Sequence, residues 1–318
     1  MLPINSSEDL QSIDSEDSHV YLENDIDMRG TSTDEIMEFN GVLDGRGHKI
    51  KNLTTSDKSE HAEGGLIDFN YGKIKNLMLE NVNMETKKEN KTIGGLVGVN
   101  KGKIINCSIV DSSIEGKQSV GGLIGKNKNI VKGSSVINST IEGSSRVGGL
   151  VGSSEKQSKI INSSAESNYY KGVRAVGGII GAILYNKGRL VGCKSSGKIE
   201  SRDFSGGIVG ENMGIEIKRC SSSCKIIGSG CMIGGIAGYN MDKICRCYYN
   251  GTLIIPSLCE KIGGICGWNM NDSSIKKCYN IEQYDWIESV GDNEGQVVDV
   301  SENNDIENIK KKILVSSL

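Results

Sequence analysis

The sequence has few of the residues that fill the core of an ordinary globular enzyme. Aromatic residues make up 5% of the chain, with only 3 Phe, whereas 42 residues are Gly and only 2 are Pro. These values favour many short strands and tight turns around a slim core. Histidine is scarce, at 3 residues, and no Ser/His/Asp set, phosphate-binding loop or dinucleotide fingerprint can be assembled. We therefore expect a protein that is not an enzyme and has no metal or cofactor.

Long apolar runs are also lacking. No stretch of 18 consecutive apolar residues exists, so we expect no membrane insertion. The first residues, Met-Leu-Pro-Ile-Asn, contain no basic segment followed by an apolar run, so they do not resemble a signal peptide. We expect a cytoplasmic protein; the alternative, a secreted or cell-surface protein, requires that a signal sequence has been removed.

The charged residues are unevenly distributed. Residues 1–40 contain eleven acids and one base, and residues 282–318 contain nine acids and three bases. The remaining 33 bases and 20 acids give residues 41–281 a net charge of +13. Acidic ends that keep the protein soluble are one interpretation, and a basic lateral face that meets an acidic partner is the other.

The dominant pattern is a repeat of glycine pairs at intervals of 27 to 30 residues. Most pairs lie in a motif such as Ile93-Gly-Gly-Leu-Val-Gly or Val147-Gly-Gly-Leu-Val-Gly, and a degraded ninth copy is present at Val290-Gly-Asp. Such a period indicates stacked supersecondary units. The pairs begin at Gly64, Gly94, Gly121, Gly148, Gly177, Gly206, Gly234 and Gly263.

Two further columns follow each glycine pair, so we expect three short strands in each unit. The first column is typified by Ile104-Ile-Asn-Cys107, in which we also place Val136-Ile-Asn-Ser139, and the second by Thr140-Ile-Glu-Gly143. A single three-strand coil cannot bury its own apolar side, but stacked coils can. The sequence therefore predicts an all-β, single-stranded, parallel β-helix of about nine coils of roughly 28 residues, right-handed by the general rule for parallel crossovers.

The Gly-Gly-Leu-Val-Gly pattern followed by Asn-Cys resembles the GLUG repeat family, which occurs in bacterial surface adhesins, in the non-catalytic part of some IgA-cleaving peptidases and in protist proteins. Residues 7–48, with Phe39-Asn-Gly-Val-Leu-Asp-Gly-Arg-Gly-His48, resemble the coil that often precedes those repeats. The resemblance implies a parallel β-helix with a binding role and no catalytic activity, in which the repeat residues are scaffold.

We expect one solenoid domain over residues 1–318. Residues 1–63 form an N-terminal cap and first coil, residues 64–290 the eight repeats, and residues 291–318 a C-terminal cap. The N-terminal cap contains a short helix at Ser6–Ile13 and a strand-like segment at His19–Met28, and the C-terminal cap contains a helix at Asp305–Leu314. Such caps cover the open edges of the last coils.

The ten cysteines permit three interpretations. Cys107, Cys193, Cys220, Cys247 and Cys278 share one repeat position, in which we also place Leu77, Ser139 and Ser163. A position that accepts Leu, Ser or Cys favours a ladder of core thiols over disulfides or a zinc cluster. Free thiols favour a reducing compartment.

A column of charged residues is the only feature that could indicate catalysis. Glu115, Glu142, Lys171 and Glu200 are 27 to 29 residues apart and should stack about 5 Å from one another. Such carboxylates could share protons or bind cations, as in β-helix polysaccharide lyases. We favour a solvated, partly compensated face, because the loops are too short to wall off a substrate.

The most specific surface feature is a basic stripe near the C-terminal end. Earlier coils have Asn76, Asn106, Asn138 and Asn162 where we align Arg219, and we expect these to form an amide ladder. The stripe favours a protein partner with an acidic surface; a glycan is possible, and nucleic acid is disfavoured because stacking aromatics are few. The oligomeric state is open. The candidate binding residues are Lys218, Arg219, Lys243, Arg246, Lys276 and Lys277.

Overall fold

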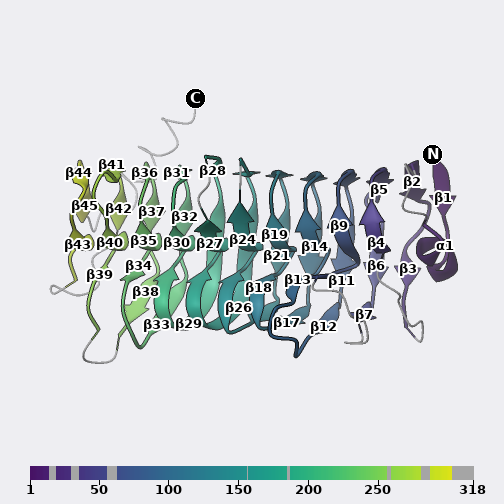
Figure 1. The fold of residues 1–318 in the computed structure, drawn as a ribbon, viewed down its shortest axis with the longest axis horizontal. Coiled ribbons are helices and arrows are strands. Elements are labelled where there is room, and N and C mark those ends of the chain that lie inside the picture. Colours follow the sequence, from purple (N-terminus) through teal and green to yellow (C-terminus); the bar gives the residue numbers. More distant parts are fainter. Residues whose placement is uncertain are drawn as a thin grey trace.

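The computed structural model of the chain is a rod of stacked parallel strands, with the N-terminus at one end of its long axis (Figure 1). It describes residues 1–13, 19–29, 36–55, 63–155, 157–184, 187–255, 259–280 and 287–302. The strands form three parallel sheets, each with one or more strands per coil. This architecture is the all-β parallel solenoid that the repeat predicts; the right-handed sense stays a prediction.

Two of the sheets contain one strand from each coil, in sequence order. Sheet A contains β1 (Leu2–Ile4), β2 (His19–Leu22), β5 (Val42–Asp44), β10 (Lys73–Lys75), β15 (Lys103–Ile105), β20 (Ile130–Lys132), β25 (Lys159–Ile161), β28 (Arg189–Val191), β31 (Glu216–Lys218), β36 (Lys243–Cys245), β41 (Ser274–Lys276) and β44 (Gln296–Val298). Sheet C contains β4 (Ile36–Phe39), β9 (Ile67–Asn70), β14 (Val97–Asn100), β19 (Ile124–Asn127), β24 (Val151–Glu155), β27 (Ile180–Leu184), β30 (Val209–Asn212), β35 (Ala237–Asn240), β40 (Cys266–Asn269) and β43 (Val290–Asn293).

Sheet B is wider, because the chain passes through it in three consecutive segments. The first segments are β3 (Ile26–Asp27), β6 (Lys49–Lys51), β11 (Met78–Glu80), β16 (Ser108–Val110), β21 (Ser135–Ile137), β32 (Ser221–Ser222), β37 (Tyr248–Tyr249), β42 (Tyr279–Asn280) and β45 (Ser301–Glu302). The second are β7 (Thr54–Thr55), β12 (Asn83–Glu85), β17 (Ser113–Glu115), β22 (Thr140–Glu142), β33 (Lys225–Gly228) and β38 (Thr252–Ile254). The third are β8 (Glu63–Gly64), β13 (Thr92–Gly94), β18 (Gln118–Gly121), β23 (Ser145–Gly148), β34 (Ile233–Gly234) and β39 (Ile262–Gly263). β26 (Ser164–Gly177) and β29 (Lys194–Gly206) run through all three segments.

The glycine pairs form a ladder through the stack, as the period predicts. Gly94 pairs with Gly121, Gly121 with Gly148, and the series continues in register to Gly263. A Cβ added at Gly121 would overlap the carbonyl oxygen of Ile124, so the sharp step from sheet B to sheet C requires glycine. Eight coils begin at these glycine pairs. The prediction of about nine coils also counted the degraded copy at Val290.

Most coils contain five short strands rather than the predicted three. Two predicted elements are each divided. The glycine element is shared between sheet B and sheet C, and the Ile-Ile-Asn-Cys motif between the end of a sheet A strand and a turn into sheet B. At this turn, which we call the first corner, Asn106 has a left-handed φ of 53°. A second corner lies between the first two segments of sheet B, and a third corner precedes each glycine pair. The left-handed residues of the third corner are Ser119, Arg146, Ala175, Phe204, Met232 and Lys261.

One predicted alignment is wrong. Val131, not Val136, pairs with Ile104 in sheet A, while Val136 pairs with Ile109 in sheet B. Asn138 therefore lies at the second corner, where its amide donates to Asp111. Both corners have a left-handed residue for which asparagine is favourable, so the sequence Val-Ile-Asn is compatible with either corner.

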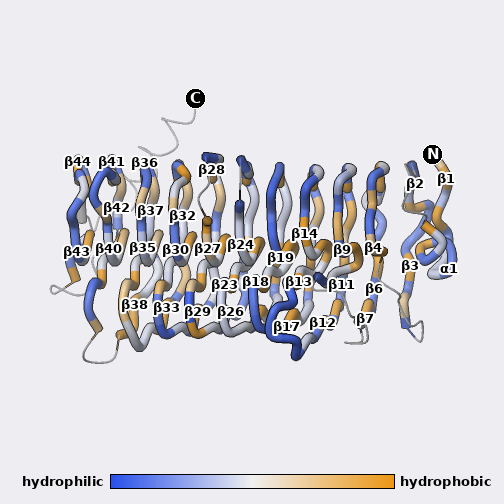
Figure 2. The backbone as a smooth tube through the Cα atoms, viewed as in Figure 1, coloured by the Kyte–Doolittle hydropathy of each residue, from blue (hydrophilic) through white to orange (hydrophobic). Residues whose placement is uncertain are grey.

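The interior is a narrow apolar column of stacked Ile, Val and Leu. Hydrophilic and hydrophobic stretches consequently alternate within each coil along the whole rod (Figure 2). One interior column is polar and was not predicted: the buried Asn70 amide donates to Asn100 at 2.7 Å, and Asn100 donates to Asn127 at 2.8 Å. The same ladder resumes from Asn212 to Asn293, after an interruption by Ser154 and Ile183.

At the N-terminal end, the predicted short helix is present as α1 (Ser7–Gln11). Ser6 and Asp9 form a capping box, in which the Asp9 backbone N–H donates to the Ser6 hydroxyl at 3.1 Å. Leu10 of this helix is buried in the core. The predicted C-terminal helix, Asp305–Leu314, lies outside the described residues. That both ends of the solenoid are capped stays a prediction.

Candidate functional site

The outer face of sheet A has a high density of basic side chains. The middle residue of each short strand points into the core, so the two flanking residues point outward. In register, Lys73 lies beside Lys103, and Lys159 beside Arg189. With the three corner cations, these residues form what we call the basic face: Lys73, Lys75, Lys103, Lys132, Lys159, Arg189, Lys218, Arg219, Lys243, Arg246, Lys276 and Lys277.

The six candidate residues all lie on this face, but in three different rows. Lys218 and Lys276 belong to one outward row of sheet A, whereas Lys243 belongs to the other, two residues earlier in its strand. The remaining three lie at the first corner. The six basic residues of the earlier coils were not predicted, although the alternation Lys73-Ile74-Lys75 is the signal that could have identified them.

Most of this charge is uncompensated. Lys75 pairs with Asp44 at 2.6 Å, and Lys218 Nζ lies 3.8 Å from Glu216. Within the described ranges, the other ten cations of the basic face form no ion pair. Neighbouring strands are about 4.8 Å apart, so like charges face one another at close range and repel. An acidic partner would remove that repulsion.

The first corner has an unusual side-chain composition in the late coils. Arg219, Arg246 and Lys277 have φ values of 51°, 55° and 54°. A left-handed backbone costs a residue with a long side chain about 1 kcal/mol, whereas glycine and asparagine adopt it readily. Earlier coils have asparagine or glycine at this corner, which adopt the left-handed backbone at lower free energy. These residues are Asn76, Asn106, Gly133, Asn162 and Gly192.

The predicted amide ladder of the first corner is short. The Asn76 amide donates to Asp44 at 3.0 Å, and the Asn106 amide lies 3.4 Å from the Asn76 oxygen. Burial by itself would raise the pKa of Asp44, but hydrogen bonds from Lys75, the Arg46 backbone and Asn76 lower it. Asp44 therefore stays ionised and anchors the early end of this corner.

The cysteines form the predicted ladder of core thiols. Cys193, Cys220, Cys247 and Cys278 are buried, and the Cys247 backbone N–H lies 3.5 Å from the Cys278 sulfur. All ten cysteines fall in the described ranges and are free thiols. Ser134, not Ser139, occupies the equivalent position in its coil, because its hydroxyl accepts from the Cys107 backbone at 3.2 Å. Burial raises the pKa of Cys107 to about 12, so this thiol is unreactive at neutral pH.

The charged column of sheet B has the predicted register. Glu115 lies beside Glu142, Glu142 beside Lys171, and Lys171 beside Glu200. Lys171 Nζ lies 3.4 Å from Glu142, and the Tyr169 hydroxyl donates to Glu200 at 2.8 Å. Part of the acidic charge is thus neutralised locally. In the part of the chain that the structure describes, no three His, Cys, Asp or Glu side chains cluster closely enough to hold a metal ion.

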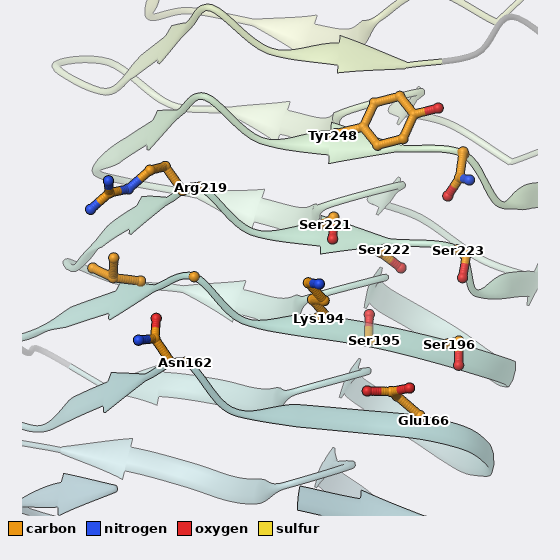
Figure 3. Close-up of a pocket in the computed structure, with 13 residues that line it drawn as sticks. Asn162, Glu166, Lys194, Ser195, Ser196, Arg219, Ser221, Ser222, Ser223 and Tyr248 are labelled. Atoms are coloured by element: carbon orange, nitrogen blue, oxygen red, sulfur yellow. The ribbon is translucent and has the colours of Figure 1, made fainter. Parts of the chain in front are cut away.

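A groove of about 820 Å³ lies beside the first corner, on the outer face of sheet B (Figure 3). It extends over four coils, from Asn162 to Asn250. Arg219 and Asn162 lie at its corner end, and Glu166 lies at the opposite end, with Lys194 between them (Figure 3). Sequence reasoning missed this groove, because small residues rather than a motif create it.

Comparison with solved structures finds a similar fold in the crystal structure of a "putative immunoglobulin A1 protease" from Bacteroides ovatus. The two chains have a TM-score of 0.55 and 16% identity, over 99% of this chain and 87% of that chain. At this identity the likeness shows the fold alone. No protein-family model and no curated protein matches the chain, so the resemblance to GLUG repeats stays a prediction. No helix in the described ranges has the length and apolar character needed to cross a membrane.

Proposed function

We propose that this chain is a non-catalytic β-solenoid that presents the basic face to an acidic surface of a partner protein. The observation that carries the proposal is the set of ten cations on sheet A and its first corner that form no ion pair with any residue that the structure describes. Parallel stacking fixes the backbone positions of these charges at regular spacing, so little backbone conformational freedom is lost when a partner binds.

The composition of the first corner supports the same function. Asn and Gly satisfy this turn at lower free energy, yet three consecutive late coils have Arg or Lys there. Residues held in a conformation that costs stability occur often at functional sites. A surface adhesin that binds proteins or glycans is the second candidate, and the resemblance of the repeats to the GLUG family favours it. A carbohydrate-active enzyme is the third, and an activity that depends on Glu142 or Lys171 would contradict the non-catalytic part of the proposal.

Charge reversal tests the basic face. The combined variant Arg219→Glu, Arg246→Glu and Lys277→Glu should weaken binding of a 20-residue polyglutamate peptide by about tenfold or more, because attraction becomes repulsion. Added salt should weaken the binding of the unmodified chain, since the charges are exposed. Fluorescence anisotropy of a labelled peptide measures both effects.

The matched control changes the net charge equally on other surfaces. Lys117→Glu, Arg202→Glu and Lys225→Glu reverse three bases that lie outside the basic face. Peptide affinity in this control should stay within about twofold of the unmodified chain, because screening limits the reach of distant charges. Equal weakening in the two triple variants would mean that only net charge matters, and the proposed face would be wrong.

A further inference from the structure

Three methionines form a column at the ends of neighbouring strands of sheet C. Met213, Met241 and Met270 directly follow β30, β35 and β40, which lie side by side in the rod (Figure 1). The Met241 backbone N–H donates to the Asn212 carbonyl at 2.9 Å, and that of Met270 donates to the Asn240 carbonyl at 2.9 Å. The parallel register therefore continues one residue beyond the strands and places the three methionines about 4.8 Å apart along the rod.

The side chains of this methionine column lie on the outer surface. The residue before each methionine belongs to the buried asparagine ladder, so strand alternation directs the methionine outward. Met241 is 42% exposed, and the other two are half-buried. Packing does not require an apolar residue here, because earlier coils have Lys101, Lys128 and Glu155 in the same column.

The thioether sulfur of methionine is a soft, neutral metal ligand. Such ligands favour Cu(I), whereas Mg²⁺ and Ca²⁺ take oxygen ligands. A methionine side chain has three rotatable bonds, so its sulfur can move without a change in the backbone. With a metal–sulfur bond of about 2.3 Å, the length of a zinc–thiolate bond, the sulfurs of Met213 and Met270 each need to lean about 2.5 Å toward Met241. All three sulfurs can therefore reach one ion.

Carboxylates without ion-pair partners lie beside the methionine column. Glu294 occupies the next place in the column, because its backbone N–H donates to the Asn269 carbonyl at 2.8 Å. Asp242 and Asp272 lie in the turns that follow the second and third methionines. Within the ranges that the structure describes, none of these three carboxylates forms an ion pair. Thioethers leave the single charge of Cu(I) uncompensated, and nearby carboxylates stabilise such a charge.

Two aromatic rings flank the column on the side of the third corner. Tyr239 and Trp268 lie two residues before the methionines of their strands, and their rings meet edge to face with centroids 5.4 Å apart. Methionine sulfur packs favourably against aromatic rings. Lys261 lies over the Trp268 ring, but its charge is compensated by Asp292 at 3.0 Å. The rings therefore add apolar surface beside the sulfurs without adding net positive charge.

We propose that Met213, Met241 and Met270 bind one Cu(I) ion through their three thioether sulfurs. The sequence predicts no metal because histidine is scarce, but a thioether site needs no histidine. An apolar docking patch for a protein explains the column less well, because leucine or isoleucine would serve that purpose equally. Yet methionine recurs in three consecutive coils of a chain that has only 9 methionines. This inference does not rest on the acidic protein partner proposed above.

Nuclear magnetic resonance of methionine methyl groups labelled with ¹³C tests the site. Exposed thiols also bind Cu(I), so the full chain carries Cys231→Ser, Cys245→Ser and Cys259→Ser, and the seven remaining cysteines are buried. The first probe is silver nitrate, because Ag(I) shares the preference for soft ligands and is stable to oxidation. The second is Cu(I) kept reduced by ascorbate. The signals of three methionines should shift with either ion and stop shifting at one equivalent.

A substitution that removes only the sulfur separates metal binding from apolar contact. Met241→Leu keeps an apolar side chain of similar size, so it should weaken Ag(I) and Cu(I) binding by about tenfold or more. The matched control, Met232→Leu, changes a half-buried methionine of the third corner that lies outside the column, and should leave binding unchanged. Thermal unfolding should show that both variants fold like the unmodified chain.

Three results would contradict the proposed site. These are no methionine shift at one equivalent of either ion, shifts of equal size in methionines outside the column, or equal affinity in Met241→Leu and Met232→Leu. The basic face is tested separately, because polyglutamate binding to that face should be unaffected by Met241→Leu.

Discussion

The first corner has one backbone conformation throughout the rod but different side chains in its early and late coils. Asn106 and Arg219 have φ values of 53° and 51°, and each donates its backbone N–H to the next coil, at 2.9 Å and 3.0 Å. The backbone of the turn is therefore the same with asparagine or arginine, and only the free-energy cost of the left-handed conformation differs. The comparison separates what the fold requires, a left-handed residue, from what the late coils add, a positive charge.

The largest expected effect comes from breaking the shared backbone. Asn106→Pro and Arg219→Pro should each lower the free energy of unfolding by about 3 kcal/mol or more, because proline fixes φ near −65° and removes the N–H. Equilibrium urea unfolding measures both. The controls Asn106→Gly and Arg219→Gly keep the left-handed turn and should change stability by well under that amount. Proline tolerated at only one of the two positions would show that the early and late corners are not equivalent.

An intermediate effect is expected from Asp44, which lies at the early end of the first corner and contacts Asn76 and Lys75. The pKa of Asp44 is lowered in the folded chain, so the unfolded chain binds more protons at acidic pH. Its contribution is present above its unfolded pKa of about 3.9 and is lost as pH falls below that value. At pH 7, Asp44→Asn should cost about 1.5–3 kcal/mol, the range for hydrogen bonds to charged groups.

Unfolding at pH 7 and at pH 3 tests this expectation. The difference in stability between the unmodified chain and Asp44→Asn should shrink at the lower pH, while Arg219→Asn should show no such change. A constant difference between Asp44→Asn and the unmodified chain at both values would mean that the ionised carboxylate does not stabilise the early corner.

The smallest effect comes from exchanging the side chains of the two regions. Arg219→Asn should raise the free energy of unfolding by about 1 kcal/mol, because asparagine adopts the left-handed backbone more readily. Asn106→Arg should lower it by at least a similar amount, because it also removes the amide that lies 3.4 Å from the Asn76 oxygen. Thermal and urea unfolding measure the two variants side by side. If Arg219→Asn destabilised the chain, Arg219 would contribute to folding, and its retention would need no binding partner to explain it.

The sequence was sufficient for the parts of the fold that recur in every coil. The glycine ladder was predicted correctly from Gly94 to Gly263, where a larger residue would collide with the backbone of the turn. The first predicted pair is one residue out of register, because Gly64 pairs with Ile93. The alignment failed at Val136–Ser139, where one coil contains two segments that fit the same pattern. The buried ladder that begins at Asn70 was missed, because an asparagine at the end of a strand reads equally well as a turn residue.

The candidate site was predicted only in part, for a different reason. Arg219, Arg246 and Lys277 were identified because they break the repeat. Lys73 and Lys103 follow the repeat and were therefore not predicted as binding residues, although strand alternation places them on the basic face. The groove could not be predicted, since it depends on Gly192 and on serines whose shared orientation only the three-dimensional register reveals.

The regular stacking of sheet A also makes the basic face a measure of length. The basic face occupies eight strands of sheet A, from β10 to β41, about 4.8 Å apart, so it extends over roughly 35 Å, the reach of an extended peptide of about 10 residues. Each coil gained or lost during evolution would change this reach by one strand spacing without altering the chemistry of any contact. Under the proposed function, the number of coils would set the length of acidic segment that the face can bind, independently of affinity at any single position.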